Sequence, residues 1–398
     1  MTTPEAHREK EKPVSRRAVA VGLVMLANAI IQFDWLTFAP MTDATAAYYH
    51  VSTDAVGYFA LCFAVLFLPL GIPSGWYIDR YGVRASLRVA GVLLAAGAVI
   101  RALDGFGGAL TGQILLAAAQ PIIMSVISPL AATRHPEDEQ LTVASLCMMA
   151  SFAGLALAFL IVPPAFSSIG IPATLAVSAV VHVLLGAAML FLSGADPVRS
   201  ATLHINTGAA FGLLRDRRYL VLVGFILLGN GYFNGLLTWL EQLLERQGFD
   251  AIHSGYAGVA IIAGGVGGAI VVPALAVRLG GLRVMAPIGL LATIVFAPVA
   301  LLTSTGLVLY TASALLGFSL MGLVPLLIDE VSAIAGAARA GFALATFWVV
   351  ANAGGAVVIA VLPAFAHGTD WRPAVWALEA ILILELVLTP LIPRSIAP

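Results

Sequence analysis

The chain has 398 residues, of which 60% are hydrophobic and only 10% are charged, whereas charged residues make up about a quarter of an ordinary soluble domain. This composition excludes a soluble protein, and a formal net charge of -1 offers no basic face to the phosphates of a nucleic acid. Cys62 and Cys147 are the only cysteines and lie far apart inside apolar runs, so we expect no disulfide framework and no metal site.

Apolar runs of membrane-spanning length follow one another through the whole sequence. A transmembrane helix needs roughly 20 apolar residues, and charged or Pro- and Gly-rich breaks separate the runs. The first run is too long and too polar for the apolar core of a cleaved signal peptide, so it counts as a span. The predicted spans cover residues 18–40, 55–77, 85–103, 107–131, 142–165, 171–193, 219–244, 254–277, 284–303, 305–328, 340–365 and 373–392.

The spans predict an all-α membrane protein with about twelve transmembrane helices in two pseudo-symmetric six-helix bundles. The longest polar break falls between the sixth and seventh spans and divides the chain almost in half. The predicted parts are a cytoplasmic N-terminal tail (1–17), an N-terminal bundle (18–193), a cytoplasmic linker (194–218), a C-terminal bundle (219–392) and a cytoplasmic C-terminal tail (393–398).

The positions of Lys and Arg predict the orientation, because cytoplasmic loops retain basic residues. With the spans above, only Arg101, Arg246 and Arg372 fall on one side of the membrane, and every other Lys and Arg falls on the opposite side. We therefore expect an integral multi-pass protein with both termini in the cytoplasm, in a prokaryotic inner membrane.

The loop between the second and third spans carries a basic glycine motif, and a degenerate copy at residues 273–283 occupies the same place in the second half. The motif comprises Gly75, Asp79, Arg80, Gly82 and Arg84. It resembles the G-x-x-x-D-R-x-G-x-R loop signature of the major facilitator superfamily, which implies a gating loop for the conformational change. We expect Gly75 to allow close helix approach, Asp79 to pair with an arginine or a helix end, and Gly82 to make the turn. An ordinary basic cytoplasmic loop is the alternative.

A narrower resemblance covers most of the first half. The segments that carry it are Asn28-Ala29 with Gln32 and Trp35, Leu68-Pro69 and Pro73 before Trp76 and Asp79, and Gly112-Gln113 with Ala119-Gln120. They resemble the feline leukaemia virus subgroup C receptor-related transporters, which implies transport of choline or ethanolamine, and that family has also been linked to haem. The resemblance places Gln120 on a cavity-lining glutamine of that family. It implies that Gln32, Thr238 or Trp239, and Trp348 replace other cavity side chains.

Polar and aromatic side chains inside the spans are the candidate substrate-binding groups, because hydrocarbon tolerates polar groups only beside the bundle interior or a wet cavity. The candidates are Asn28, Gln32, Trp35, Gln120, Asn230, Asn234, Trp239, Trp348 and Asn352. The first three recur at helical spacing on one stripe. Interhelical hydrogen bonding would also explain the asparagines. Helix packing would explain the tryptophans, and we expect Trp371 and Trp376 to lie in interfacial belts.

Asp34 and Glu241 are the candidate proton- or ion-coupling groups. A carboxylate in hydrocarbon costs about 2.5–3.5 kcal/mol. Asp34 is therefore expected to exchange protons, to bind a cation or to form half of a buried pair, unless it touches interfacial water at the outer end. Glu241 lies towards the outer end of its span, where simple exposure is the alternative to coupling.

Four other features receive structural interpretations. We expect Glu379 and Glu385 in the last span to be supporting or oligomer contacts. Arg101 is expected to pair with Asp104, and His182 is the one histidine in its apolar span, without a predicted partner. The glycines of residues 264–268 have a spacing typical of close helix packing.

The sequence thus predicts a secondary active or facilitative transporter that moves a small organic solute by alternating access through a central cavity. A cationic or zwitterionic amine such as choline is favoured, because no Lys or Arg lies at mid-membrane to clamp a dianion. The alternative is a proton-coupled drug or metabolite exporter. We expect no cofactor, no enzyme motif and no ATP-binding loop, a monomer, and protons or sodium as coupled ions. A transport-inactive sensor of the same fold stays open.

Overall fold

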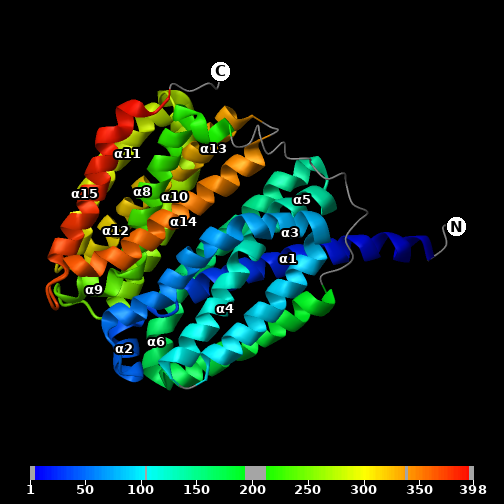
Figure 1. Cartoon of the computed structure of the whole chain (residues 1–398), viewed down its shortest axis with the longest axis horizontal. Helices are drawn as coiled ribbons and strands as arrows, with labels where there is room; N and C mark the ends of the chain where they lie inside the picture. The colour runs from blue at the N-terminus through cyan, green and yellow to red at the C-terminus, as the bar shows by residue number, and fades with distance from the viewer. Residues whose placement is uncertain (1–4, 104, 193–211, 337–338, 394–398) are drawn as a thin grey trace. The chain divides into compact units, whose positions relative to one another are not determined.

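The computed structural model describes residues 5–103, 105–192, 212–336 and 339–393, which form helices joined by short turns (Figure 1). Only helices close their backbone hydrogen bonds within one segment, so long apolar runs take this form in a membrane. Ten helices in these ranges are long and apolar enough to cross a bilayer. The helices are α1 (Glu5–Trp35), η1 (Ala39–Met41), α2 (Thr42–Tyr49), α3 (Thr53–Arg101), α4 (Phe106–Ser125), α5 (Ile127–Arg134), α6 (Glu137–Leu192), η2 (Leu213–Arg215), α8 (Arg217–Thr238), α9 (Leu240–Glu245), α10 (Ala251–Leu279), α11 (Leu282–Leu301), α12 (Gly306–Met321), α13 (Leu323–Ala335), α14 (Ala340–Val361), η3 (Leu362–Phe365), α15 (Arg372–Leu388) and η4 (Thr389–Leu391).

Two of these helices each contain two predicted spans. α3 has 49 residues and α6 has 56, and each is interrupted by a glycine with positive φ, Gly82 (φ 85°) or Gly170 (φ 80°). A residue with a Cβ is strained at such φ values, so glycine suits these breaks. Both glycines fall in the predicted breaks between spans. Counting α3 and α6 as two spans each is consistent with twelve spans, and the all-α membrane fold is confirmed.

The chain packs into two compact units, each built from several stretches. Unit 1 contains Met1–Trp35, Pro69–Leu155 and Ile169–Leu203, and unit 2 contains Leu36–Leu68, Ala156–Ser168 and His204–Pro398. The predicted bundles over 18–193 and 219–392 stay a prediction. Much of the predicted linker and C-terminal tail lies outside the described residues.

Glycines set the closest helix contacts of unit 2, where α10 packs on α12. A Cβ added at Gly264 would lie 1.9 Å from the carbonyl oxygen of Ala314, and one at Gly317 would lie 1.8 Å from that of Ile261. No side chain fits at such distances, so the two backbones meet directly. This is the close packing that the glycine spacing predicts.

Candidate functional site

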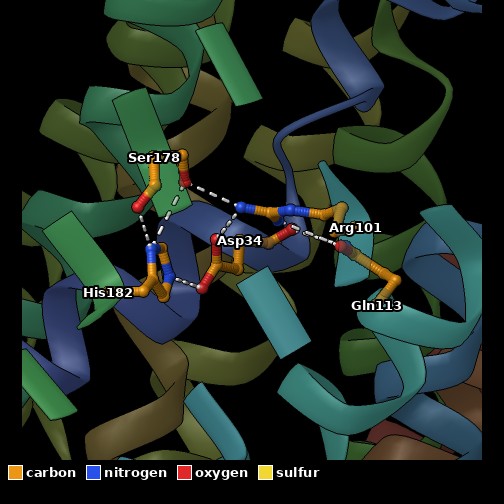
Figure 2. Close-up of polar contacts among 5 residues, drawn as sticks. All are labelled: Asp34, Arg101, Gln113, Ser178 and His182. Carbon is orange, nitrogen blue, oxygen red and sulfur yellow. Dashed lines mark hydrogen bonds and ion pairs between the residues drawn. The ribbon is translucent and has the colours of Figure 1, made fainter. Parts of the chain in front are cut away.

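A buried ion cluster surrounds Asp34 in unit 1 (Figure 2). Asp34 lies in the last turn of α1, Arg101 is the last residue of α3, and His182 lies in the second half of α6. Arg101 Nη2 is 2.9 Å from Asp34 Oδ1, and His182 Nε2 is 2.6 Å from Asp34 Oδ2. All three side chains are almost fully shielded from solvent. One carboxylate therefore faces two basic groups.

Neutral groups add hydrogen bonds to this cluster, whereas the buried Arg101 Nε has no hydrogen-bond partner among the described residues. Arg101 donates through Nη1 to Gln113 Oε1 at 3.0 Å and through Nη2 to Ser178 Oγ at 2.8 Å. Gln113 donates in turn to the backbone oxygen of Asp34 at 2.7 Å. A charge left without such partners in a low-dielectric interior costs several kcal/mol. These contacts therefore fix the guanidinium beside the carboxylate.

His182 joins Asp34 to its own helix. Nε2 faces the Asp34 carboxylate at 2.6 Å, and Nδ1 lies 2.7 Å from the backbone oxygen of Ser178 and 3.3 Å from Ser178 Oγ. Polar contacts at both ring nitrogens therefore fix the orientation of the imidazole.

Asp34 is thus half of a buried pair, one of the alternatives left open by the sequence. His182, the one histidine in its apolar span, meets Asp34 across 148 positions of the sequence. Asp104 lies outside the described residues, so its pairing with Arg101 is not described, and Arg101 instead pairs with Asp34. The one available signal was the presence of ionisable residues in apolar helices, where charges persist mainly in combination.

Two of the remaining unit 1 candidates contact each other. Gln120 Nε2 lies 3.5 Å from Gln32 Oε1, and both side chains are buried. Asn28 instead donates to the Val24 backbone oxygen at 2.9 Å, one turn earlier in α1. Gln120 Oε1 is buried and has no hydrogen-bond partner among the described residues. It therefore lacks the partner that buried polar atoms normally have.

Trp35 closes α1 one turn after Gln32. Its side chain is 7% exposed, and Gln32 is 9% exposed, so neither faces lipid. Unit 1 therefore holds a group of neutral candidates, Gln32, Trp35 and Gln120, that is chemically distinct from the ion cluster around Asp34.

The unit 2 asparagines lie where α8 packs on α14. Asn230 Nδ2 donates to the backbone oxygen of Ala351 at 2.8 Å. Asn234 is buried, and a Cβ at Gly355 would meet its amide nitrogen at 2.1 Å. Asn230 therefore makes an interhelical hydrogen bond, the role that the sequence left open beside solute binding.

Trp239 and Trp348, the two candidate tryptophans of unit 2, differ in burial. Trp239 is 1% exposed, donates to the Ile359 backbone oxygen at 3.1 Å, and has its ring centroid 5.2 Å from that of Trp371. Trp371 lies directly before the span that begins at Arg372 and is buried against Trp239, whereas Trp376 is 57% exposed; the interfacial position of both stays a prediction. Trp348 is half-buried beside Phe347.

Asn352, the last substrate-binding candidate, lies on α14 and is half-buried. Its Nδ2 donates to the backbone oxygen of Trp348 at 2.9 Å, one turn earlier. Its Oδ1 is not needed for this bond. Asn352 and Trp348 therefore lie together on α14, and their contact with a solute stays a prediction.

Glu241 lies in α9, after the span that ends at Thr238, although the sequence predicted one span through residue 244. Its buried carboxylate accepts a hydrogen bond from the backbone N–H of Thr42, the first residue of α2. Gln242 also donates to this carboxylate at 3.4 Å. A negative charge at a helix N-terminus complements the helix dipole. Glu241 therefore caps α2 instead of lying exposed.

Replacing Glu241 with Ala is expected to lower the thermal midpoint of unfolding. The substitution leaves the Thr42 N–H buried without an acceptor, at a cost of about 1–3 kcal/mol. Glu241→Gln keeps an acceptor oxygen and is expected to fall between Ala and the unsubstituted protein. Thermal unfolding in detergent, followed by tryptophan fluorescence, measures the order. Equal midpoints for all three proteins would rule out the cap.

The three arginines predicted on the outer side all have acidic partners. Arg101 pairs with Asp34, while Arg246 and Arg372 lie 3.0 and 2.8 Å from Asp370. Asp370 lies in the turn before α15. A hydrogen bond from Arg372, together with the charges of Arg246 and Arg372, lowers the pKa of Asp370 to about 2. The Asp370 carboxylate therefore stays ionised at physiological pH and joins two loops of unit 2.

The motif of the predicted gating loop lies within α3. Gly82 supplies the turn at positive φ, and the Arg80 guanidinium lies 5.9 Å from the ring centroid of Trp76. A Cβ added at Gly75 would meet no atom within 4 Å, so the close helix approach expected there is not present. The gating role of Gly75, Asp79, Arg80, Gly82 and Arg84 stays a prediction.

Comparison with known proteins identifies related sequences. Residues 24–359 match the family described as Major Facilitator Superfamily. The chain is 27% identical over 285 residues to solute carrier family 49 member A3 of Xenopus tropicalis. The matched region covers 64% of this chain and 58% of that protein. It is 24% identical over 284 residues to the choline/ethanolamine transporter FLVCR2 of Homo sapiens, covering 65% and 54%. The chain thus spans less than two thirds of these relatives' own length.

Solved structures share the fold at low sequence identity. A D-xylose-proton symporter superposes with a TM-score of 0.76 at 14% identity, covering 96% of this chain and 99% of that one. A bacterial homologue of the human lysosomal transporter Spinster, in an inward-facing unoccupied conformation, has a TM-score of 0.74 at 14% identity and covers 94% and 95%. At this identity the likeness concerns the fold alone.

Proposed function

The chain belongs to the Major Facilitator Superfamily, and from that premise we propose that it moves a small cationic or zwitterionic amine such as choline by alternating access. The family match and the ten helices of spanning length make this a multi-pass membrane protein. Its proposed activity is transport of a small solute, not catalysis of a reaction. The proposal concerns the solute, the mechanism and the residues that contact the solute.

The unpartnered oxygen of Gln120 is the observation that carries the proposal. Gln120 Oε1 is a buried acceptor without a hydrogen-bond partner among the described residues, and the amide of Gln32 lies beside it. A solute with a hydroxyl or ammonium donor would supply the missing hydrogen bond. Trp35, on the same helix as Gln32, offers a ring face, and cation–π attraction to an ammonium is worth about 0.5–2 kcal/mol.

Charge supports the same class of solute. The nine candidate substrate-binding residues are all uncharged, and the buried Arg101 of unit 1 is already engaged by Asp34, Gln113 and Ser178. A dianion would need a free basic clamp. Relatives from Homo sapiens and Danio rerio are named choline/ethanolamine transporters, so these amines are the first solutes to test.

Uptake into proteoliposomes tests the solute class. We expect saturable uptake of radiolabelled choline or ethanolamine that excess unlabelled amine inhibits, and no saturable uptake of a labelled dicarboxylate. Liposomes with the same lipids and no protein are the control. Saturable dicarboxylate flux without amine flux would contradict the proposal.

Replacing Gln120 with Leu is expected to raise the KM for the amine. Leu has a similar size but no acceptor, so the solute loses a hydrogen bond worth about 0.5–1.5 kcal/mol, which corresponds to about a twofold to tenfold rise in KM. Thr293→Val removes a buried hydroxyl from unit 2 that bonds Ser319, and serves as the matched control. An unchanged KM in Gln120→Leu would remove Gln120 from the site.

The alternative, a proton-coupled exporter, gives Asp34 a different role, because it requires Asp34 or Glu241 to exchange protons. Asp34 faces Arg101 and His182 at ion-pair distance, and the positive guanidinium of Arg101 favours the ionised carboxylate. We therefore propose that Asp34 holds unit 1 together and that proton exchange takes place elsewhere. Localisation in a prokaryotic inner membrane, cytoplasmic termini and a monomeric state belong to the same proposal.

A further inference from the structure

Two acidic side chains of α15 are buried inside unit 2. Glu379 is 3% exposed and Glu385 is 4% exposed, although both lie in an apolar span, Arg372–Leu391. Contacts with another copy of the chain need exposed side chains, so the expected role in oligomer contacts is wrong. Glu379 Oε1 and Glu385 Oε2 are buried and have no hydrogen-bond partner among the described residues.

The facing surface of α8 brings a third polar group to these acids. α15 packs against α8, and a Cβ at Gly229 would lie 3.4 Å from Glu385 Oε1. Tyr232, one turn further along α8, is 0% exposed, and its hydroxyl also lacks a partner among the described residues. Glu379 is an electrostatic neighbour of this hydroxyl. We call Tyr232, Glu379 and Glu385 the α8–α15 acid cluster.

No described basic side chain forms an ion pair with the acid cluster. Asp34, by contrast, lies beside Arg101 and His182. The elements packed against α15 are α8, α9, α11, η3 and η4. Besides Tyr232, these elements contain the following acidic, basic and tyrosine residues: Arg217, Arg218, Tyr219, Glu241, Glu245 and Arg283. α15 itself adds Arg372, its first residue. The five exposed ones lie at helix ends, while Tyr219 donates to the Ala343 backbone oxygen and Glu241 caps α2.

An ionised carboxylate in such surroundings is unfavourable. The carboxylate must therefore carry a proton or bind a cation. Among the described residues, no group of three or more His, Cys, Asp and Glu side chains could hold a metal ion. A proton needs no ligand besides the carboxylate itself.

We propose that the α8–α15 acid cluster is a proton-binding site, and that a proton taken up there from one side of the membrane and released to the other is coupled to solute transport. Glu379 and Glu385 are the proton-binding groups, and Tyr232, whose hydroxyl is an electrostatic neighbour of Glu379, is a positioning residue. The coupling rests on the proposed transport function, whereas proton binding does not. The two parts are therefore tested by separate measurements.

Infrared spectroscopy of the full-length protein in liposomes tests proton binding. We expect a C=O band of protonated carboxyl groups that disappears as the pH is raised, is reduced in Glu379→Gln and in Glu385→Gln, and is unchanged in Glu245→Gln, whose side chain is exposed. Tyr232→Phe keeps the ring and is expected to shift the pH midpoint of the band. Identical spectra for the wild type and both Gln variants would overturn the proposal. Loss of the band on adding NaCl at constant pH, but not KCl, would overturn it in favour of a sodium site.

Solute uptake under an imposed pH gradient tests the coupling. We expect the gradient to accelerate uptake of labelled choline in the wild type and in Glu245→Gln, and this stimulation to be lost in the Glu379→Gln/Glu385→Gln double variant. Stimulation that persists in the double variant would overturn the coupling. If no solute is transported while the carboxyl band still titrates, the proposed function fails and the proton site stands.

Discussion

Asp34→Asn is expected to destabilise the protein by about 3–5 kcal/mol, the cost of removing one partner from a buried ion pair. The amide cannot balance Arg101 and His182, which lie 2.9 and 2.6 Å from the carboxylate oxygens. The Arg101 guanidinium would then remain in the interior of unit 1 without an opposite charge beside it. Thermal unfolding in detergent, with size-exclusion chromatography of the heated sample, measures the lower midpoint.

A second substitution separates charge from packing in this cluster. Arg101→Met removes the guanidinium that pairs with Asp34, so the Asp34→Asn/Arg101→Met double variant is expected to be less destabilised than the two single variants added together. Such non-additivity is characteristic of residues in one network. Additive effects, or an Asp34→Asn protein as stable as the wild type, would contradict the assignment of a buried pair.

Gly317→Ala is expected to destabilise unit 2 by about 1–3 kcal/mol or more, as overpacking does in other cores. The added Cβ would lie 1.8 Å from the carbonyl oxygen of Ile261, so α10 and α12 must separate. Separation exposes neighbouring contacts on both helices, and a backbone oxygen cannot move aside as a flexible side chain can. The thermal midpoint in detergent again provides the measurement.

Gly267→Ala is the matched control, because it lies on the same pair of helices with open space around it. Its nearest neighbouring atom, in Phe318, would be 3.8 Å from the new Cβ, which is an ordinary contact. Alanine also has the higher helix propensity. We expect no loss of stability for Gly267→Ala. Equal losses for Gly267→Ala and Gly317→Ala would show that the α10–α12 contact adapts.

The membrane fold could be predicted because local sequence determines both the spans, through their hydropathy, and the breaks between them, through glycine. Each apolar run is long enough to span the bilayer without help from distant residues, and the two long helices break at Gly82 and Gly170, inside predicted breaks. The end of the seventh span could not be predicted as well. The apolar run continues through Leu244, but α8 ends at Thr238 and α9 begins at Leu240.

Partners of buried polar groups could not be predicted, because they depend on helix rotation and on contacts far apart in sequence. His182 showed no neighbouring acid in its own span, yet it meets Asp34. Glu379 and Glu385 showed no preferred face in the sequence, yet both point into unit 2. The sequence does show which ionisable residues lie inside spans. Each of them needs a partner, a bound proton or a bound ion, but the sequence does not show which.

Counterflow of labelled choline in proteoliposomes tests the central claim, transport of an amine by alternating access, most directly. A carrier that alternates between two sides returns faster when it is loaded, so unlabelled choline inside the vesicles should accelerate entry of labelled choline, and Gln120→Leu should weaken this at low choline concentration. Labelled choline that enters no faster into preloaded than into empty vesicles, or that enters vesicles without protein equally fast, would contradict the account.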